Sequence, residues 1–140
     1  MKKVRVIFSP EAEEVYGHLN EIAPTSKIDT SILNAINKKV ELIKANIHYG
    51  EPIAKRLIPE EYKIKYGSTN LFRVELPSFW RMLYTLTDGE SQIEIVAFVI
   101  DILDHKDYSK KFGYKNWFLP FKQSFIAHFI RRIKSEFPKV

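Results

Sequence analysis

Three runs of alternating apolar residues, all within residues 71–102, constrain the fold of this chain more than any other part of its sequence. Successive side chains of a β-strand point to opposite faces of a sheet, so each run predicts a strand. Two breaks separate the runs, at Pro77-Ser78 and at Asp88-Gly89, and the second is typical of a hairpin turn. We therefore expect three consecutive antiparallel strands at the centre of the fold.

The alternation places two arginines on the same side of the predicted sheet. Arg73 lies opposite the apolar side chains of the first run and shares its face with Glu75, and Arg81 lies opposite the large apolar residues of the second run. The third run, 93–102, is apolar on both faces apart from two carboxylates. This pattern indicates a strand that is covered on both sides, so we expect it at or near the centre of the sheet.

Two helices are predicted before these strands. Residues 3–8 alternate as a short first strand, and a serine–proline pair then marks the start of a helix over about residues 10–21. A second helix begins after Ser26, and its apolar stripe repeats every three or four residues until Gly50. The stripe consists of Ile28, Ile32, Ile36, Val40, Ile43 and Ile47. We expect the two helices to form a hairpin on one face of the sheet.

Two further segments are basic. Residues 51–70 are punctuated by proline and glycine and carry several lysines and arginines, so we interpret them as a basic connector, with a solvated loop as the alternative. Residues 115–140 combine an aromatic and aliphatic stripe with basic side chains, which predicts a basic amphipathic helix. Such a helix can dock on its own domain, on a partner protein or on an anionic membrane surface. We expect it to dock on its own domain or on a second protomer, which would give a homo-oligomer.

Composition narrows the classes of function. With 140 residues, of which 45% are hydrophobic, the chain can bury one core without disulfides. It contains no cysteine, which excludes thiol catalysis and favours a reducing compartment, so we expect a cytoplasmic location. No apolar run is long enough to span a membrane, and we expect no integral membrane association. The net charge of +5 favours a polyanionic partner.

Titratable side chains from Asp104 to Tyr108 follow the third predicted strand directly. A strand end can hold reactive groups rigidly, and the imidazole of His105 can serve as an acid or a base near neutral pH. A solvated turn with a capping role is the alternative. The remaining histidines show no metal-ligand spacing, so we expect neither a metal nor another cofactor. These histidines are His18, His48 and His128.

The order of these elements resembles the RelE/ParE superfamily of toxins. The resemblance rests on the order and spacing of five stretches within residues 1–114, and residues 115–140 have no counterpart in a minimal toxin of this kind. The stretches are Phe8-Ser9-Pro10-Glu11-Ala12, Pro59-Glu60-Glu61-Tyr62, Leu71-Phe72-Arg73-Val74-Glu75-Leu76, Trp80-Arg81-Met82-Leu83-Tyr84 and residues 99–108. The expected fold is α+β, one small domain with an N-terminal strand and a two-helix hairpin packed on an antiparallel sheet, followed by a C-terminal amphipathic helix.

RelE-like members cleave messenger RNA in the ribosomal A site without a metal, by driving the ribose 2′-hydroxyl onto the adjacent phosphate. The resemblance therefore implies a type II toxin that inhibits translation, with a cognate antitoxin, mRNA and the ribosome as partners. The reaction needs a base, cations beside the phosphate and an acid for the leaving oxygen. By position, the resemblance implies catalytic roles for Arg81, His105, Tyr108 and Glu75, and RNA or phosphate binding by Arg73, Lys63, Lys65 and Lys106.

Two other functions stay open. ParE-like members block DNA gyrase by binding alone, and an inactive relative would act as a binding module. Glu75 is either a base or the ion-pair neighbour of Arg73, and Arg81 is either a phosphate ligand or a structural arginine that pairs with Glu75 or Asp101 across the sheet. The endonuclease hypothesis predicts that four basic residues converge in one concavity. They are Arg73, Arg81, His105 and Lys106.

Overall fold

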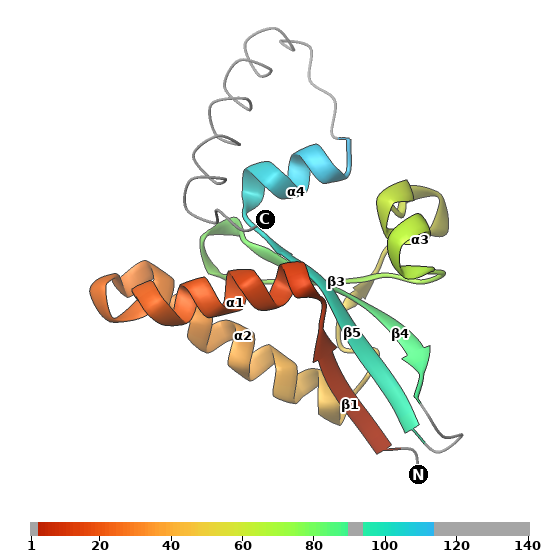
Figure 1. The fold of residues 1–140 in the computed structure, drawn as a ribbon, viewed down its shortest axis with the longest axis horizontal. Helices are drawn as coiled ribbons and strands as arrows, with labels where there is room; N and C mark the ends of the chain where they lie inside the picture. Colours follow the sequence, from red (N-terminus) through yellow and green to blue (C-terminus); the bar gives the residue numbers. More distant parts are fainter. Residues whose placement is uncertain (1–2, 90–93, 114–140) are drawn as a thin grey trace, which may run out of the picture.

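The structure is a computed structural model, and it describes residues 3–89 and 94–113 of the chain. These residues form an α+β fold in which helices cover both faces of a five-stranded mixed sheet (Figure 1). The strands are β1 (Lys3–Phe8), β2 (Glu51–Pro52), β3 (Phe72–Glu75), β4 (Arg81–Asp88) and β5 (Glu94–Leu103). The α-helices are α1 (Pro10–Ile22), α2 (Lys27–Ala45), α3 (Glu60–Tyr66) and α4 (His105–Lys111). Short 3₁₀ helices are η1 (Ala23–Thr25), η2 (Lys55–Leu57) and η3 (Pro77–Phe79).

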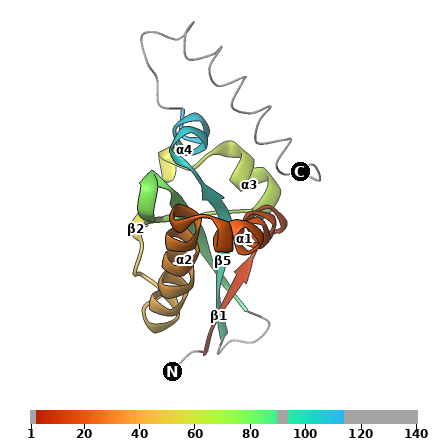
Figure 2. The same cartoon turned by 90° about the vertical axis from the view of Figure 1, so that its left-hand side faces the viewer.

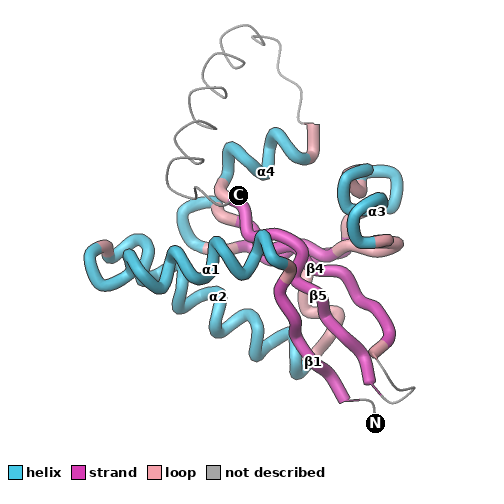
Figure 3. Tube along the Cα trace, in the orientation of Figure 1, coloured by secondary structure: helices cyan, strands magenta, loops and turns pink. Residues whose placement is uncertain are grey.

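The sheet contains a parallel pair, so the prediction of an antiparallel sheet is wrong on this point. The strand order is β1-β5-β4-β3-β2, and β1 pairs with β5 in parallel, whereas β5, β4, β3 and β2 pair antiparallel. Figure 3 shows β1, β5 and β4 side by side. The chain runs from β1 through α1, α2, β2, α3, β3 and β4 before it reaches β5, and this long connection permits the parallel pairing that a hairpin turn does not. The three predicted strands are confirmed as β3, β4 and β5.

The helices α1 and α2 form the predicted hairpin on one face of the sheet (Figure 2). Ser9 caps α1 by accepting a hydrogen bond of 3.0 Å from the Ala12 N–H, and Ser26 caps α2 by accepting one of 3.3 Å from the Asp29 N–H. Each cap satisfies a backbone donor that has no partner within its helix. The core under the hairpin includes Leu19, Ile32, Ile36, Ile43, Phe72, Val74, Met82, Tyr84, Val99 and Ile102.

The apolar stripe of α2 is shorter than predicted at both ends. Ile28 is 63% exposed, and the helix is capped at Asn46, so Ile47 lies beyond it. Tyr84 holds the turn that follows α2. Its hydroxyl accepts a 2.9 Å hydrogen bond from the Gly50 N–H and donates one of 2.8 Å to the Ile47 carbonyl. Which positions of the stripe are buried depends on how far the sheet extends beneath the helix. The periodicity of the sequence does not predict that extent.

The interpretation of residues 51–70 as a connector is wrong in part, because they contain β2, η2 and α3. Helix α3 covers the face of the sheet opposite α1 and α2, where Tyr62 is buried. The residues packed together on this second face include Ile58, Tyr62, Leu71, Leu83, Ile100, Leu103 and Tyr108. The second face is therefore a core of its own, and α4 contributes to it through Tyr108.

A β-bulge determines which side chains of β5 reach the second face. Leu83 pairs with Asp101 and Tyr84 pairs with Val99, so Ile100 is the additional residue on the β5 side. A bulge interrupts the simple alternation of a strand. Ile100 and Asp101 consequently both face α3, where Asp101 accepts a 2.6 Å hydrogen bond from the Tyr62 hydroxyl.

Within residues 3–89 and 94–113, no helix has the length and apolar character needed to cross a membrane. The C-terminal amphipathic helix expected at residues 115–140 lies outside the described residues, as do positions 90–93 between β4 and β5.

Candidate functional site

Two arginines lie close together on the second face of the sheet, where β3 and β4 pair. In the β3–β4 register Arg73 is opposite Leu83, and Arg81 is opposite Glu75. The period-two alternation of both strands turns the two guanidinium groups away from the α1–α2 hairpin, as the sequence predicts. Their side chains are mostly buried, with exposed fractions of 23% for Arg73 and 14% for Arg81.

Two glutamates pair with these arginines. Glu75 joins them, because its carboxylate oxygens lie 3.3 Å from Arg73 Nε and 3.0 Å from Arg81 Nε. Glu51 of β2 lies 2.9 Å from Arg73 Nη2. Both glutamates are largely exposed, at 58% for Glu75 and 67% for Glu51. The alternative in which Arg81 pairs with Glu75 across the sheet is therefore the pairing that the structure contains.

The ion pairs leave the two Nε atoms without hydrogen bonds. Arg73 Nε and Arg81 Nε are buried and have no hydrogen-bond partner, although Glu75 is within ion-pair distance of both. The Nε–oxygen distances to Glu75 are short enough for an ion pair, but neither Nε–H group points at a carboxylate oxygen closely enough to form a hydrogen bond. Buried donors of this kind are uncommon in folded proteins and call for an explanation.

Tyr108 supports both guanidinium groups from α4. Its hydroxyl accepts a 3.0 Å hydrogen bond from Arg73 Nη1, and its ring centre lies 5.0 Å from Arg81 Cζ. The hydrogen bond to Tyr108 is the main cause that raises the pKa of Arg73 above its ordinary value, so this side chain stays cationic. Tyr108 itself is buried. We call Arg73, Arg81, Glu75, Glu51 and Tyr108 together the arginine site.

Helix α4 is positioned by a cap that the sequence contains. Asp104 accepts a 2.8 Å hydrogen bond from the Asp107 N–H, and this begins the helix directly after β5. The capping alternative for the polar cluster is thus correct for Asp104. Burial raises the pKa of Asp104, and the charge of Lys106 partly opposes that rise.

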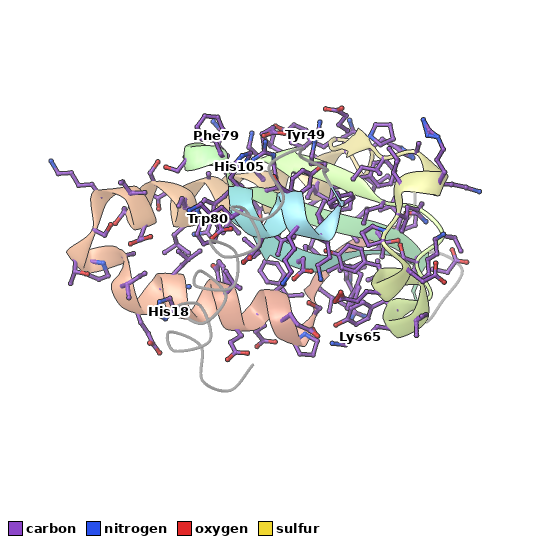
Figure 4. The ribbon with its side chains drawn as sticks, turned by 90° about the horizontal axis from the view of Figure 1, so that it is seen from above. His18, Tyr49, Lys65, Phe79, Trp80 and His105 are labelled. Carbon is purple, nitrogen blue, oxygen red and sulfur yellow. The ribbon has the colours of Figure 1, made fainter. Side chains whose placement is uncertain are left out.

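His105 lies at the edge of the arginine site. It is exposed at the first position of α4, and its ring centre lies 5.9 Å from that of Phe79 in the loop between β3 and β4. The Phe79 carbonyl in turn accepts a hydrogen bond from Arg81 Nη1. Figure 4 shows His105 and Phe79 beside one another. The structure thus links His105 to Arg81 through Phe79.

Two of the three lysines assigned to RNA or phosphate binding pair with glutamates outside the arginine site. Lys63 lies 3.8 Å from Glu60 within α3, and Lys65 pairs with Glu11 of α1. Figure 4 shows Lys65 well separated from His105 and Phe79. These contacts give the two lysines no place in the arginine site.

Glu51 and Phe79 are site residues that sequence reasoning missed. Glu51 follows Gly50 in a strand of only two residues, where it lies opposite Arg73 in the β2–β3 register. A strand of that length leaves no periodic pattern. Phe79 did leave a signal, because a large aromatic residue is unusual beside the Pro77-Ser78 turn residues.

A separate cavity of about 590 Å³ is lined by residues of α1, α3, β5 and α4. Its acidic lining residues are Glu11, Glu60, Glu61, Asp101, Asp104 and Asp107. Burial raises the pKa of Asp101, and burial together with the neighbouring Asp104 raises that of Asp107 to about 6. So many carboxylates disfavour a phosphate ligand in this cavity. In the described part of the chain, no three histidine or acidic side chains are grouped so as to hold a metal ion.

Comparisons of the chain with protein-family models, with curated proteins and with solved structures gave no match. We therefore base the function on the chemistry of the arginine site and on the order of motifs in the sequence.

Proposed function

We propose that this chain is a RelE-like, ribosome-dependent RNA endonuclease, the toxin of a type II toxin–antitoxin pair, which cleaves mRNA without a metal ion. The observation that carries the proposal is a pair of mostly buried guanidinium groups, those of Arg73 and Arg81. In the described part of the chain, the carboxylates that form ion pairs with them belong to Glu75 and Glu51, and both of these are largely exposed. An antitoxin, mRNA and the ribosome are the partners that follow from it.

A phosphate can replace the glutamates at low cost. Both carboxylates are largely exposed, so when an anion arrives Glu51 can turn into solvent and Glu75 can turn from the arginines toward the 2′-hydroxyl of the bound RNA. A guanidinium holds a phosphate through two parallel N–H donors, and the buried Nε atoms of Arg73 and Arg81 supply donors that lack acceptors. The buried Tyr108 keeps both groups in position through its hydrogen bond to Arg73 and its ring contact with Arg81.

The same residues can perform the three steps of transphosphorylation. Glu75 would accept the proton of the 2′-hydroxyl as its oxygen attacks the adjacent phosphorus. Arg73 and Arg81 would stabilise the charge that develops on the phosphate oxygens. His105 would donate a proton to the leaving 5′-oxygen, which gives a 2′,3′-cyclic phosphate and a 5′-hydroxyl. Tyr108 then acts as a positioning residue for the arginines, since it is buried beneath them.

The Arg81–Glu75 ion pair also favours a second candidate, in which the arginines are structural and the chain acts by binding, as ParE-like gyrase inhibitors do. The two candidates differ in their product. An endonuclease leaves cut mRNA, whereas a gyrase inhibitor leaves mRNA intact and blocks DNA supercoiling.

The deciding experiment adds the purified chain to ribosomes translating a defined mRNA and maps the new 5′ ends, with a gyrase supercoiling assay in parallel. We expect cuts within translated codons, and a fall of about 100-fold or more for Arg81→Ala and for His105→Ala. Arg56→Ala, at an exposed arginine of η2, is the matched control and should cut normally. Intact mRNA with blocked supercoiling would instead establish the ParE-like candidate.

A further inference from the structure

Phe79 is an exposed aromatic side chain in a tightly closed loop. The loop has three residues, Pro77 to Phe79, and the Leu76 N–H donates a 2.9 Å hydrogen bond to the Trp80 carbonyl across its base. Ser78 and Phe79 both have left-handed backbone angles, with φ of 59° and 63°. Such loops normally place glycine at a left-handed position, because a side chain there is strained.

Strain and exposure at the same residue indicate a function. Phe79 is 70% exposed, so its ring contributes little to the core. Non-glycine residues with left-handed angles cluster at binding and catalytic sites, where the surrounding structure holds them in place. Here the holding contact is known, since Arg81 Nη1 donates a hydrogen bond to the Phe79 carbonyl. The side chain that binds phosphate in the proposed function therefore also fixes the position of the ring.

His105 extends the aromatic surface. Its ring centre lies 5.9 Å from that of Phe79, with an angle of 57° between the two planes. This is the ordinary separation of a tilted aromatic pair. Because Phe79 stays 70% exposed, His105 covers only part of the ring. A free aromatic face thus lies next to Arg81, which Glu75 joins to Arg73.

We propose that Phe79, flanked by His105, is the stacking surface for a nucleobase of the bound RNA, a role that rests on the proposed function. A nucleotide is a planar aromatic ring joined to a phosphate, and this site offers a ring surface beside two guanidinium groups. Bases stack on exposed aromatic side chains of proteins that bind single-stranded nucleic acid. Stacking on Phe79 requires a base that is not stacked in a duplex, so the substrate is single-stranded.

The test separates stacking from charge by comparing two anions. The dissociation constants of a single-stranded ribo-oligonucleotide and of inorganic polyphosphate, which has no bases, are measured for the full chain and its variants. Phe79→Ala should weaken oligonucleotide binding about tenfold and leave polyphosphate binding unchanged. Phe79→Tyr keeps the ring and should restore the affinity. Ile64→Ala truncates a side chain of α3 that is 78% exposed, and should change neither constant.

The outcomes distinguish a failure of the stacking role from a failure of phosphate binding at the arginine site. Equal oligonucleotide affinity in Phe79→Ala and the wild type, or an equal loss for both anions, would overturn the stacking role and leave the arginine site standing. A wild-type chain that binds neither anion would overturn the stacking role and the phosphate binding assigned to Arg73 and Arg81, whereas the cleavage assay on ribosomes decides the proposed function separately.

Discussion

The hydroxyl of Tyr108 accepts a 3.0 Å hydrogen bond from Arg73 Nη1, and so connects α4 to β3. The two residues are far apart in sequence and come together because α4 begins immediately after β5, which lies beside β4 in the sheet. The tyrosine ring also lies 5.0 Å from the guanidinium carbon of Arg81. One buried side chain therefore orients both cations, and its two contacts can be separated by mutation.

Tyr108→Phe removes the hydroxyl that accepts the hydrogen bond from Arg73, and keeps the ring under Arg81. We expect the free energy of unfolding to fall by about 1 kcal/mol, since Arg73 Nη1 loses its acceptor. RNA binding should weaken a few-fold, because Arg73 is less well oriented. Tyr108→Ala removes the ring as well and should cost about 3 to 5 kcal/mol. Urea unfolding measures the change in stability, and oligonucleotide titration measures the change in affinity. If Tyr108→Phe has the stability and the RNA affinity of the wild type, the hydrogen bond does not orient Arg73.

The two glutamates of the arginine site should respond differently to neutralisation. Glu51→Gln removes a carboxylate that competes with phosphate for Arg73, so we expect tighter RNA binding and an unchanged cleavage rate. Glu75→Gln removes the same kind of competitor and also the proposed base. Its binding should tighten as well, while single-turnover cleavage falls by about 100-fold or more. Cleavage at the wild-type rate by Glu75→Gln would reduce Glu75 to an ion-pair partner.

The sequence predicts the parts of the site that depend on local periodicity. Alternation in β3 and β4 puts Arg73 and Arg81 on one face, and these positions are confirmed. The serine–proline pair predicts the start of α1 correctly, at Pro10. These features follow from the geometry of single strands and helix caps, which involve only neighbouring residues.

The parts that sequence does not predict depend on contacts between distant segments. The parallel pairing of β1 with β5 can be predicted only if the path of the chain between these two strands is known. The bulge at Ile100 interrupts the alternation from which the faces of a strand are predicted. Glu51 reaches Arg73 from a strand of two residues, too short to show any period. The position of Phe79 depends on a strained loop, which departs from the residue preferences that sequence reasoning uses.

Asp107 should make the stability of the chain depend on pH. Burial, followed by the charge of Asp104, raises the pKa of Asp107 to about 6, and Lys110 opposes this rise. The folded chain then binds this proton more tightly than the unfolded chain, whose aspartate has a pKa of about 3.9. The free energy of unfolding should therefore fall as pH rises from about 4 to about 6.

The variant Asp107→Asn removes this titration. After allowance for partial exposure of the side chain, we expect it to be more stable than wild type by about 1 kcal/mol at pH 7 and equal to it below about pH 4. Urea unfolding across this pH range measures the difference. A variant that is less stable than wild type at pH 7 would mean that the Asp107 carboxylate is stabilised in the folded chain.

Gly50 should be intolerant of any side chain, because it lies in the turn before β2, which packs directly on Tyr84. A Cβ at this position would lie 2.9 Å from Tyr84 Cε1 and 3.0 Å from Phe72 Cβ, both closer than a normal contact. Phe72 and Tyr84 are buried and stacked on each other, with ring centres 5.1 Å apart, so neither can move aside easily. Gly50→Ala should lower the free energy of unfolding by about 1 to 3 kcal/mol. Because Glu51 follows directly, the same change should also weaken its pairing with Arg73.

Gly17→Ala is the matched control for this prediction, since an added Cβ there meets nothing within 4 Å. Gly17 lies inside α1, where alanine is favoured over glycine, so this variant should be more stable than wild type by about 0.5 to 1 kcal/mol. Both changes add the same methyl group, and thermal or urea unfolding compares them directly. If the two variants shift the free energy of unfolding in the same direction, the packing of Gly50 against Tyr84 does not limit this turn. Opposite shifts would show that the Tyr84 contact fixes the start of β2, and with it the position from which Glu51 reaches the arginine site.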